Sequence, residues 1–394
     1  MMELRGRYNT AKVFTNNIES SAIGQIIELC NQEFAKDNKI RVMPDCHTGA
    51  GCTVGTTMTI KDKIVPNLVG VDIGCGMELA VIDIHKEEIN FDQLDDVVRK
   101  YVPSGFSIRS TTHPFVSQVP IKDLIAPVNL VRAEKSIGTL GGGNHFVELN
   151  EWGDKVALVI HSGSRNLGKQ VAEFYQDLAY DELMEQKDQR DAVIKQLKKE
   201  GREQEIEQAL KNLKKPKISK DLAYLEGESF KAYMHDMKIA QKYAEVNRKA
   251  MIQEIVKNMG WKVVDGFTTI HNYIDMENMI MRKGAISAQK GERVIVPMNM
   301  RDGSIIAIGK GNPDWNYSAP HGAGRIYSRS KAKRELSIDE FKETMKDVWS
   351  TSVLPETLDE SPMAYKQMHE IIENTKDSFE IEQIIKPLYN FKAH

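Results

Sequence analysis

The chain has 394 residues, which suits one large domain or two, and its 41% hydrophobic and 28% charged residues are typical of a globular protein. The net charge of −3 argues neither for nor against a nucleic-acid partner. Four cysteines in so long a chain exclude a disulfide scaffold. No stretch approaches the roughly 18 apolar residues of a membrane span, and no signal peptide is recognisable. We therefore expect a cytoplasmic protein without a membrane partner.

The predicted elements begin with a helix and continue with strands. Within residues 1–35, the segment "SSAIGQIIELCNQEF" has the pattern of a helix. From residue 40 to 85, short apolar runs broken by glycine predict strands joined by tight loops. A further apolar run, "KVALVIHSGSR", predicts a buried strand with a histidine at its end.

Residues 168–260 are predicted to be helical and highly charged. Within residues 195–220, nine Lys or Arg stand against four Glu, so this part is either a solvated helical hairpin or an arm that faces RNA. The run "ERVIVPMNMRDGSIIAIG" predicts a β-hairpin that turns at Asp302-Gly303. Residues 336–390 are predicted to be mostly helical. The irregular alternation of elements indicates one mixed α/β domain over residues 1–394 with a helical insertion at about 168–260.

Three of the ten histidines share one setting. His145, His161 and His271 each adjoin an apolar, strand-like run and are flanked by small or polar residues. One histidine in such a place is more often a buried core residue than a ligand, but three in the same setting favour ligands. The other histidines without this setting are His85, His113, His235, His369 and His394.

The segment "VGVDIGCGME" supplies further ligand candidates. Asp72 and Cys75 lie three residues apart, and the surrounding glycines let the backbone close around a small ligand. One carboxylate, one thiolate and three imidazoles are too many for one tetrahedral ion, so they suggest two metals with Cys75 as a bridge. The thiolate favours zinc, whereas the other ligands leave manganese, iron or cobalt open. The alternative is a turn that holds a buried structural cysteine.

Residues 318–325 read "SAPHGAGR". The small residues after His321 leave space beside its imidazole, which could bind a metal, act as a general base or act as a nucleophile. Arg325 could give paired donors to phosphate oxygens. Four more cations follow it closely: Arg329, Lys331, Lys333 and Arg334. A histidine that attacks the α-phosphate of a nucleotide would account for the open space, the cations and a nearby metal together.

Seven segments, in this order, resemble the RtcB-type RNA ligases: "MPDCHTGAG", "VGVDIGCGM", "GGGNHFVEL", "VIHSGSRNLG", "IHNYID", "SAPHGAGR" and "SPMAYKQM". The resemblance spans most of the chain. It implies a single compact α+β domain whose β-sheets pack around a central metal cleft. The chain departs from the family at Pro320, where a cysteine or threonine is common.

The resemblance also implies roles for individual residues. Two Mn²⁺ ions would be held by Asp72, Cys75, His145, His161 and His271. His321 would carry GMP through a phosphoramidate bond, with Asp45 orienting it. Glu148 and Lys392 would read guanine, and the other nucleotide contacts would be Asn144, Phe146, Ser304, Gly322, Ala323, Gly324, Arg325 and Tyr365. The expected RNA or phosphate contacts are Arg165, Arg329, Lys331 and Lys333.

The function that the resemblance implies is a GTP- and Mn-dependent RNA ligase. It would join 3′-phosphate or 2′,3′-cyclic phosphate ends to 5′-hydroxyl ends, in tRNA splicing or RNA repair, with an archease-type activator as a further partner. One alternative is a binuclear-metal phosphodiesterase or phosphatase that acts on RNA ends without guanylylation, which would leave His321 and Glu148 without a role. A second alternative is a non-catalytic module that binds RNA ends. Labelling by GTP and metal analysis would separate the three.

Overall fold

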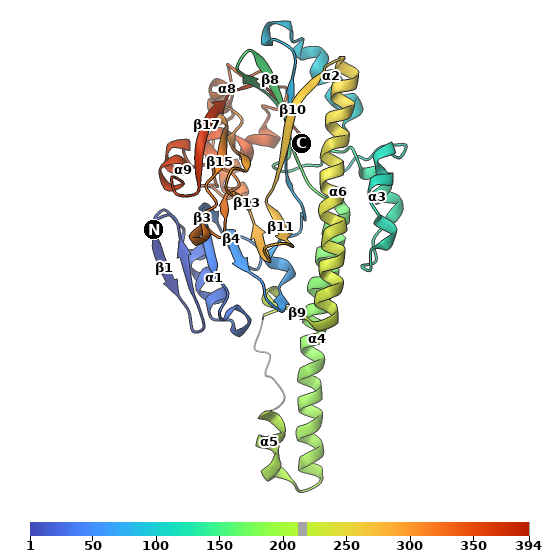
Figure 1. Ribbon diagram of the computed structural model, residues 1–394, viewed down its shortest axis with the longest axis vertical. Coiled ribbons are helices and arrows are strands. Elements are labelled where there is room, and N and C mark those ends of the chain that lie inside the picture. The colour runs from blue at the N-terminus through green and yellow to red at the C-terminus, as the bar shows by residue number, and fades with distance from the viewer. Residues whose placement is uncertain (212–218, 394) are drawn as a thin grey trace.

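A computed structural model describes residues 1–211 and 219–393 of the chain (Figure 1). Two larger sheets carry most of the strands, and a long helix runs along one of them (Figure 1). Helices and strands alternate irregularly along the chain, and both contribute side chains to shared hydrophobic cores. The expected α+β class is therefore confirmed.

The first sheet has six strands, in the order β1 (Met2–Arg5), β2 (Thr10–Val13), β3 (Ile40–His47), β4 (Val54–Thr59), β12 (Ile280–Lys283) and β11 (Asn272–Asp275). Neighbouring strands are antiparallel except β2 and β3, which are parallel. The pairing of β3 with β4 is irregular between Val42 and His47. Such an irregularity re-aims side chains, and it lies where β3 carries Asp45 and His47.

The second sheet has five antiparallel strands, in the order β10 (Val263–Ile270), β6 (Gly76–Ile82), β8 (Lys155–Ser162), β7 (Phe146–Trp152) and β18 (Pro387–Lys392). Gly76 pairs with Ser162 and Ile270, and Phe146 pairs with His161 and Lys392. The C-terminal ends of β10, β8 and β18 therefore lie beside the N-terminal ends of β6 and β7. Residues far apart in the sequence meet at this end of the sheet.

Strand β6 of the five-stranded sheet is covered on both faces. Leu79 and Val81 of β6 pack against a three-stranded sheet of β14 (Arg293–Asn299), β15 (Gly303–Gly309) and β17 (Phe379–Ile385). Ala80 and Ile82 point to the other face, where helices cover them. This alternation follows the two-residue period of a strand. Two short antiparallel pairs are β13 (Ala285–Ser287) with β16 (Ser318–Pro320), and β5 (Lys63–Ile64) with β9 (Leu225–Glu226).

The α-helices are α1 (Ser20–Cys30), α2 (Phe91–Tyr101), α3 (Leu130–Ser136), α4 (Arg165–Lys199), α5 (Ile206–Lys211), α6 (Gly227–Met259), α7 (Arg329–Glu335), α8 (Ile338–Thr344) and α9 (Met368–Asn374). Helix α6 packs against β6 and β8 as well as α2 and α4. Its buried side chains recur every three or four residues, as at Tyr233, Met237, Ala240 and Tyr243, which is the spacing of a core-facing helix stripe.

The predicted helical insertion divides into two parts. Helix α6 belongs to the core, whereas the distal half of α4 and α5 extend away from the sheets (Figure 1). In the extending part, Arg202 pairs with Glu200 at 2.8 Å and with Glu205 at 2.7 Å, so some of its charge is neutralised locally. Three of the nine cations counted there, Lys214, Lys215 and Lys217, lie outside the described residues. Whether this part faces RNA stays a prediction.

The structure confirms the predicted β-hairpin but not the whole of the predicted C-terminal helical segment. The hairpin at 292–309 forms, and Gly303 takes the positive φ of +82°. The prediction that residues 336–390 are mostly helical is wrong for its last part, because α8 and α9 are followed by β17 and β18. Glu380 and Glu382 alternate with Phe379 and Ile381 in β17, with the glutamates on the exposed side. This two-residue period indicates a strand.

Across residues 1–211 and 219–393, no helix has both the length and the apolar character that crossing a membrane requires.

Candidate metal and nucleotide site

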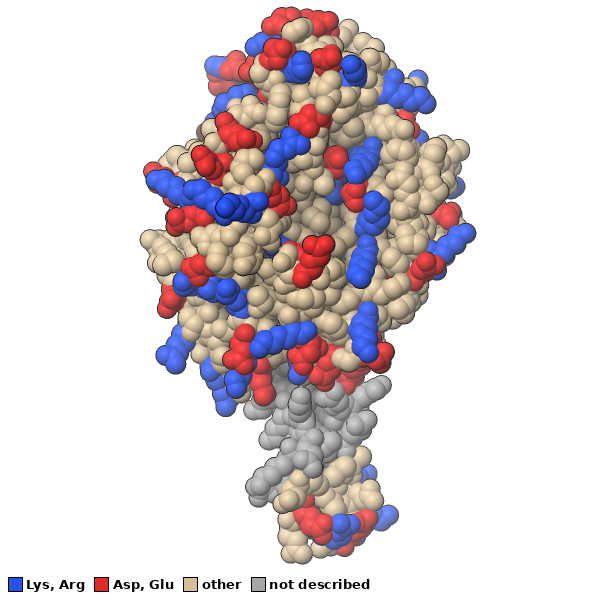
Figure 2. Space-filling view, viewed as in Figure 1, with Lys and Arg blue, Asp and Glu red and all other residues tan. Residues whose placement is uncertain are grey.

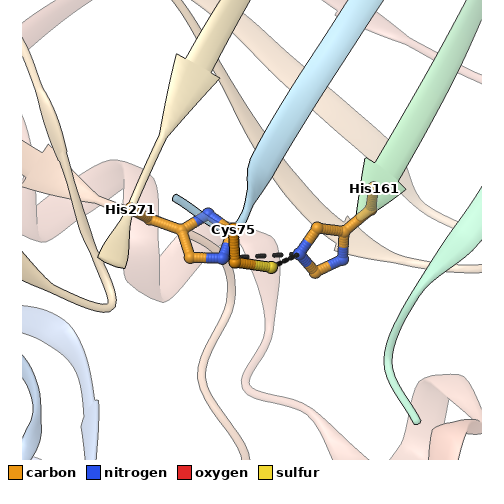
Figure 3. A group of neighbouring side chains, drawn as sticks. All are labelled: Cys75, His161 and His271. Carbon is orange, nitrogen blue, oxygen red and sulfur yellow. Dashed lines mark hydrogen bonds between the residues drawn. The ribbon is translucent and has the colours of Figure 1, made fainter. Parts of the chain in front are cut away.

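A thiol and two imidazoles meet at the end of the five-stranded sheet. Cys75 immediately precedes β6, His161 lies near the end of β8, and His271 follows β10 (Figure 3). Cys75 Sγ lies 3.3 Å from His161 Nε2, which lies 3.4 Å from His271 Nε2. The potential ligand atoms of this group are all within 4.8 Å of one another, which is the spacing that one ion needs.

A second group shares the same cysteine. His145, which precedes β7, places Nε2 3.5 Å from Cys75 Sγ and 3.0 Å from Asp72 Oδ2. The potential ligand atoms of Asp72, Cys75 and His145 also lie within 4.8 Å of one another. All five predicted metal ligands thus gather at one place, and Cys75 lies at the junction expected of a bridging thiolate.

The hydrogen bonds of two histidines leave their other ring nitrogens free for a cation. His145 Nδ1 lies 2.8 Å from the carbonyl oxygen of Leu140, and His161 Nδ1 lies 3.1 Å from that of Asn144. A carbonyl oxygen only accepts, so each Nδ1 carries a proton. Each Nε2 faces the other donor atoms of the cluster, where a bound cation would use its lone pair and would replace the contact of His145 Nε2 with Asp72. This arrangement fits a divalent metal, with the backbone carbonyls fixing the ring orientation.

The protonation states agree with that fit. Burial and the nearby imidazoles hold the pKa of His161 and of His271 well below the usual value, so both rings are neutral. Burial raises the pKa of Asp72, but its hydrogen bond to His145 and the charge of Arg165 outweigh this and lower it to about 2. Burial and Asp72 raise the pKa of the Cys75 thiol. A bound cation would reverse the effect at Cys75 by favouring the thiolate.

Helix α6 holds the loops that carry these ligands. The fully buried Arg248 donates through Nη1 to the carbonyl oxygens of Gly74, at 2.7 Å, and Ser162, at 3.0 Å. Asn247 donates to the carbonyl oxygens of Thr139 and Gly163 at 3.1 and 3.0 Å. One helix thereby fixes the chain on both sides of the cluster, and the charge pattern of residues 168–260 gave no indication of this role.

His321 lies beside the first group, in the loop after β16. Its ring centre is 4.9 Å from that of His271. Its Nδ1 lies 2.6 Å from Oδ2 of the buried Asp45, although the angle is poor for a hydrogen bond. The same oxygen accepts from the backbone N–H groups of His321 and Gly322, at 3.1 and 3.2 Å. Asp45 therefore holds both the ring and the loop of His321, which leaves Nε2 as the ring nitrogen away from this carboxylate.

The loop of His321 requires glycine at position 324. Gly324 has a φ of +76°, and a Cβ there would lie 2.3 Å from the carbonyl oxygen of Asp45. Both the backbone conformation and the close approach exclude a side chain.

A cavity of about 590 Å³ opens in front of His321. Nine predicted nucleotide contacts line it: Asn144, Phe146, Glu148, Gly322, Ala323, Gly324, Arg325, Tyr365 and Lys392. Ser304 does not line it. This serine is fully buried behind the lining residues Pro297 and Gly303, and its Oγ has no hydrogen-bond partner in the described part of the chain.

Glu148 and Lys392 lie on neighbouring strands at the inner end of this cavity. Glu148 Oε2 accepts from Nδ2 of Asn390 at 2.7 Å. Burial raises the pKa of Glu148 to about 7, with Asn390 and Lys392 opposing the shift. Lys392 Nζ lies 3.0 Å from Oε2 of Glu360 and 5.2 Å from the ring centre of Phe146. The two predicted guanine readers thus face one cavity, but Lys392 already has a carboxylate partner.

The cations after His321 have carboxylate partners that the sequence analysis missed. Glu360, in the short 3-10 helix Pro355–Glu360, lies 3.2 Å from Nη1 of Arg325 and 2.5 Å from Nη1 of Arg329. Asp359 lies 2.7 Å from Arg329 and 3.3 Å from Lys333. Burial raises the pKa of Glu360, but Lys392 and Arg329 outweigh this and lower it to about 2. The basic run is therefore largely neutralised. Acidic and basic side chains are also interspersed over the face of the molecule that Figure 2 shows.

The other two predicted RNA or phosphate contacts are Lys331 and Arg165. Lys331 lies 3.9 Å from Glu335 on the exposed face of α7. Arg165, the first residue of α4, lies close enough to Asp72 for its charge to lower the pKa of that carboxyl group. Its Nε is 3.4 Å from Thr139 Oγ1, and the neighbouring Ser164 donates its backbone N–H to Asp72 at 3.1 Å.

His47 was also missed. It lines the cavity near His321, and its Nδ1 lies 3.1 Å from the carbonyl oxygen of Asp45. Burial and the charge of His321 lower its pKa. The small residues that follow it in "DCHTGAG" are the available signal, because they repeat the setting of His321 in "PHGAGR".

Comparison with known proteins identifies the family. The model of the family "tRNA-splicing ligase RtcB" matches residues 25–128 and 117–393. The chain belongs to the RtcB family. It is 30% identical to "RNA-splicing ligase RtcB" of Escherichia coli K12, with 92% of each chain covered. It is 25% identical to "tRNA-splicing ligase RtcB" of Aeropyrum pernix, with 84% of this chain and 82% of the relative covered.

Family membership confirms the resemblance of the seven segments and makes an RNA ligase the enzyme class of this fold. The roles of individual residues, the identity of the metal and the use of GTP stay predictions at this point.

Proposed function

We propose that this chain is a GTP-dependent RNA ligase that joins 3′-phosphate or 2′,3′-cyclic phosphate ends to 5′-hydroxyl ends. The observation that carries the proposal is the position of His321. Its ring stands between a five-ligand metal cluster and a cavity large enough for a nucleotide, and a buried carboxylate holds its Nδ1. That is the geometry of a nucleophile poised at Nε2.

Each group of the site has a task in the proposed reaction. His321 Nε2 attacks the α-phosphate of GTP, pyrophosphate leaves, and the Asp45 carboxylate stabilises the positive ring. An oxygen of the RNA 3′-phosphate then attacks the phosphorus of GMP, and the bond to Nε2 breaks. The 5′-hydroxyl finally attacks the activated 3′-phosphate and displaces GMP. Each step exchanges one bond to phosphorus for another, and the energy comes from GTP.

Two Mn²⁺ ions fit the donor set, one between Asp72, Cys75 and His145 and the other between Cys75, His161 and His271. Divalent metals at these positions would neutralise phosphate charge and activate the water that opens a 2′,3′-cyclic phosphate. We further propose that the RNA substrate is a broken or spliced tRNA-like end and that an archease-type activator assists turnover.

Guanylylation tests this proposal directly. We expect protein incubated with Mn²⁺ and GTP labelled at the α-phosphate to retain the label on a denaturing gel. GTP labelled at the γ-phosphate should leave none. The bond should be acid-labile, as a phosphoramidate is, and His321→Ala should abolish it while keeping its metal content. His369→Ala is a matched control, because His369 lies outside the cavity lining.

The alternative, a metal-dependent phosphodiesterase or phosphatase, predicts no label at all. Label retained by His321→Ala through an acid-labile bond would assign the nucleophile to another residue.

A further inference from the structure

A second groove lies beside the segment that leads to His145 and beside the start of α4. It has a volume of about 900 Å³ and is bounded by residues 104–108, by Gly142 and Gly143, by the start of α4, by α7 and by the 3-10 helix Pro355–Glu360. Arg329 and Glu360 line both this groove and the nucleotide cavity, so the two spaces adjoin at these residues.

The inner end of the groove begins next to Asp72. Arg165 lines the groove, and the preceding Ser164 donates its backbone N–H to Asp72 Oδ1 at 3.1 Å. The guanidinium of Arg165 packs on Gly141, where a Cβ would lie within 1.9 Å of it. An anionic group that enters the groove would thus meet an arginine directly before the metal ligands.

The outer wall of the groove combines cations with an exposed aromatic ring. Arg132 and Lys169 line it, together with Phe106. Phe106 is 95% exposed, the highest value among the large hydrophobic side chains of the described residues. Among the described residues, the ion-pair partner of Lys169 is the exposed Glu173, at 3.6 Å, a pair that contributes little stability. The acidic lining residues, Glu356, Asp359 and Glu360, lie on the side of α7, where Asp359 and Glu360 pair with Arg329. Cations beside an exposed aromatic ring, as at the Phe106 side, are the arrangement that single-stranded nucleic acid binds.

The loop that presents Phe106 is held firmly. The backbone N–H of Gly105 donates to the carbonyl oxygen of Gly141 at 2.9 Å, and Arg132 donates to that of Phe106 at 3.1 Å. The N–H of Arg109 donates to the carbonyl of Lys135 at 3.0 Å. Phe106 therefore projects from an anchored segment, which makes it a preorganised surface for stacking.

We propose that this groove binds the RNA strand that carries the 3′-phosphate, with a base of that strand stacked on Phe106 and backbone phosphates beside Arg132 and Lys169. The assignment rests on the proposed function. In an in-line displacement the entering oxygen and the leaving nitrogen lie on opposite sides of phosphorus. The 3′-phosphate must therefore approach the phosphorus of GMP from the side away from His321 Nε2. The groove shares Arg329 and Glu360 with the nucleotide cavity and reaches Arg165, next to Asp72, so it offers such an approach.

Binding of a single-stranded RNA with a 3′-phosphate tests the stacking, measured by fluorescence anisotropy without GTP. Loss of one stacked base costs roughly five- to 150-fold in affinity, so we expect Phe106→Ala to weaken binding by about ten-fold. Phe106→Trp should retain the affinity of the wild type, because it keeps an aromatic face. Ile125→Ala is the matched control, because Ile125 is also exposed, at 56%, and does not line the groove.

The charge contacts have a separate signature. Lys169→Gln should flatten the slope of log affinity against log salt by about 0.7, as expected for one lost phosphate contact to a single strand. Phe106→Ala should lower the affinity without changing this slope. Lys231→Gln serves as the control, since Lys231 is an exposed lysine with an exposed glutamate partner outside the groove.

Three results would overturn the assignment: unchanged binding in Phe106→Ala, equal loss in Phe106→Ala and Phe106→Trp, or an effect restricted to RNA with a 5′-hydroxyl end and no 3′-phosphate. Labelling by GTP is measured in parallel and should be the same in all groove variants. Failure of labelling in the wild type would count against the proposed function, whereas failure of the RNA-binding differences alone would count against the groove.

Discussion

The charge of Glu148 determines how the cavity can recognise a base. Guanine offers two donors, N1–H and the 2-amino group, which suit an ionised carboxylate, whereas adenine offers an acceptor at N1. Burial raises the pKa of Glu148 to about 7. The carboxyl group is therefore ionised above pH 7 and becomes protonated as the pH falls below it. If Glu148 reads guanine, as proposed, this recognition should be present at higher pH and lost at lower pH.

We predict that the preference for GTP over ATP in labelling of His321 decreases as the pH falls through about 7. Glu148→Gln should remove most of this pH dependence and reduce the preference by about ten-fold or more, since a hydrogen bond to a charged group contributes ~1.5–3 kcal/mol. The ratio of the two labelling rates is the measurement, because protonation of the metal ligands affects both nucleotides alike. An equal ratio at all pH values in the wild type would contradict this role.

The position of Cys75 between two ligand groups leads to a prediction about metal content. Cys75→Ala should lose both metals, because its Sγ belongs to both groups, whereas His161→Ala should retain the metal held by Asp72, Cys75 and His145. Elemental analysis of the purified variants measures the difference. Equal metal loss in the two variants, or none in Cys75→Ala, would exclude a bridging thiolate.

At the scale of elements, the loop after β16 sets the position of His321 through Gly324. We predict that Gly324→Ala sharply reduces labelling by GTP, since the added Cβ would displace the loop from Asp45. Gly260→Ala is a matched control. Gly260 has a similar φ of +70° at the C-terminal end of α6, but a Cβ there would meet nothing within 4 Å. Gly260→Ala should lose about 1 kcal/mol of stability from backbone strain alone. Gly324→Ala should lose more, because its Cβ also meets the backbone of Asp45, and it alone should lose labelling. Full activity of Gly324→Ala would show that the loop tolerates displacement.

The sequence predicts the elements that carry the metal ligands because each ligand adjoins an apolar, strand-like run. His145, His161 and His271 lie at the ends of antiparallel strands. The C-terminal ends of β8 and β10 lie beside the N-terminal ends of β6 and β7, so the three histidines meet at one end of the sheet. The sequence does not predict Glu360, because its partners Arg325, Arg329 and Lys392 are remote in the chain and meet it only through tertiary packing. Strand β17 lies within residues 336–390, which are predicted to be mostly helical, although the two-residue spacing of Glu380 and Glu382 indicates a strand.

At the scale of the whole molecule, the extending part of α4 stands apart from the sheets (Figure 1). Lys198 and Lys199, near the end of this helix, line neither the nucleotide cavity nor the groove. We therefore predict that Lys198→Gln combined with Lys199→Gln leaves the salt dependence of RNA binding unchanged. Lys169→Gln, whose lysine lines the groove at the start of the same helix, should reduce it. A comparable reduction in both variants would instead assign an RNA-binding role to the extending part.

The fate of the RNA phosphate tests the account's central claim most directly. An RNA with a ³²P-labelled 3′-phosphate is incubated with a 5′-hydroxyl RNA, GTP and Mn²⁺, and the products are then treated with phosphatase. A ligase that activates the 3′-phosphate retains the labelled phosphorus in the new phosphodiester. We predict a longer, phosphatase-resistant labelled product that requires both GTP and His321. Release of the label as inorganic phosphate, or a product formed equally well by His321→Ala, would contradict the account.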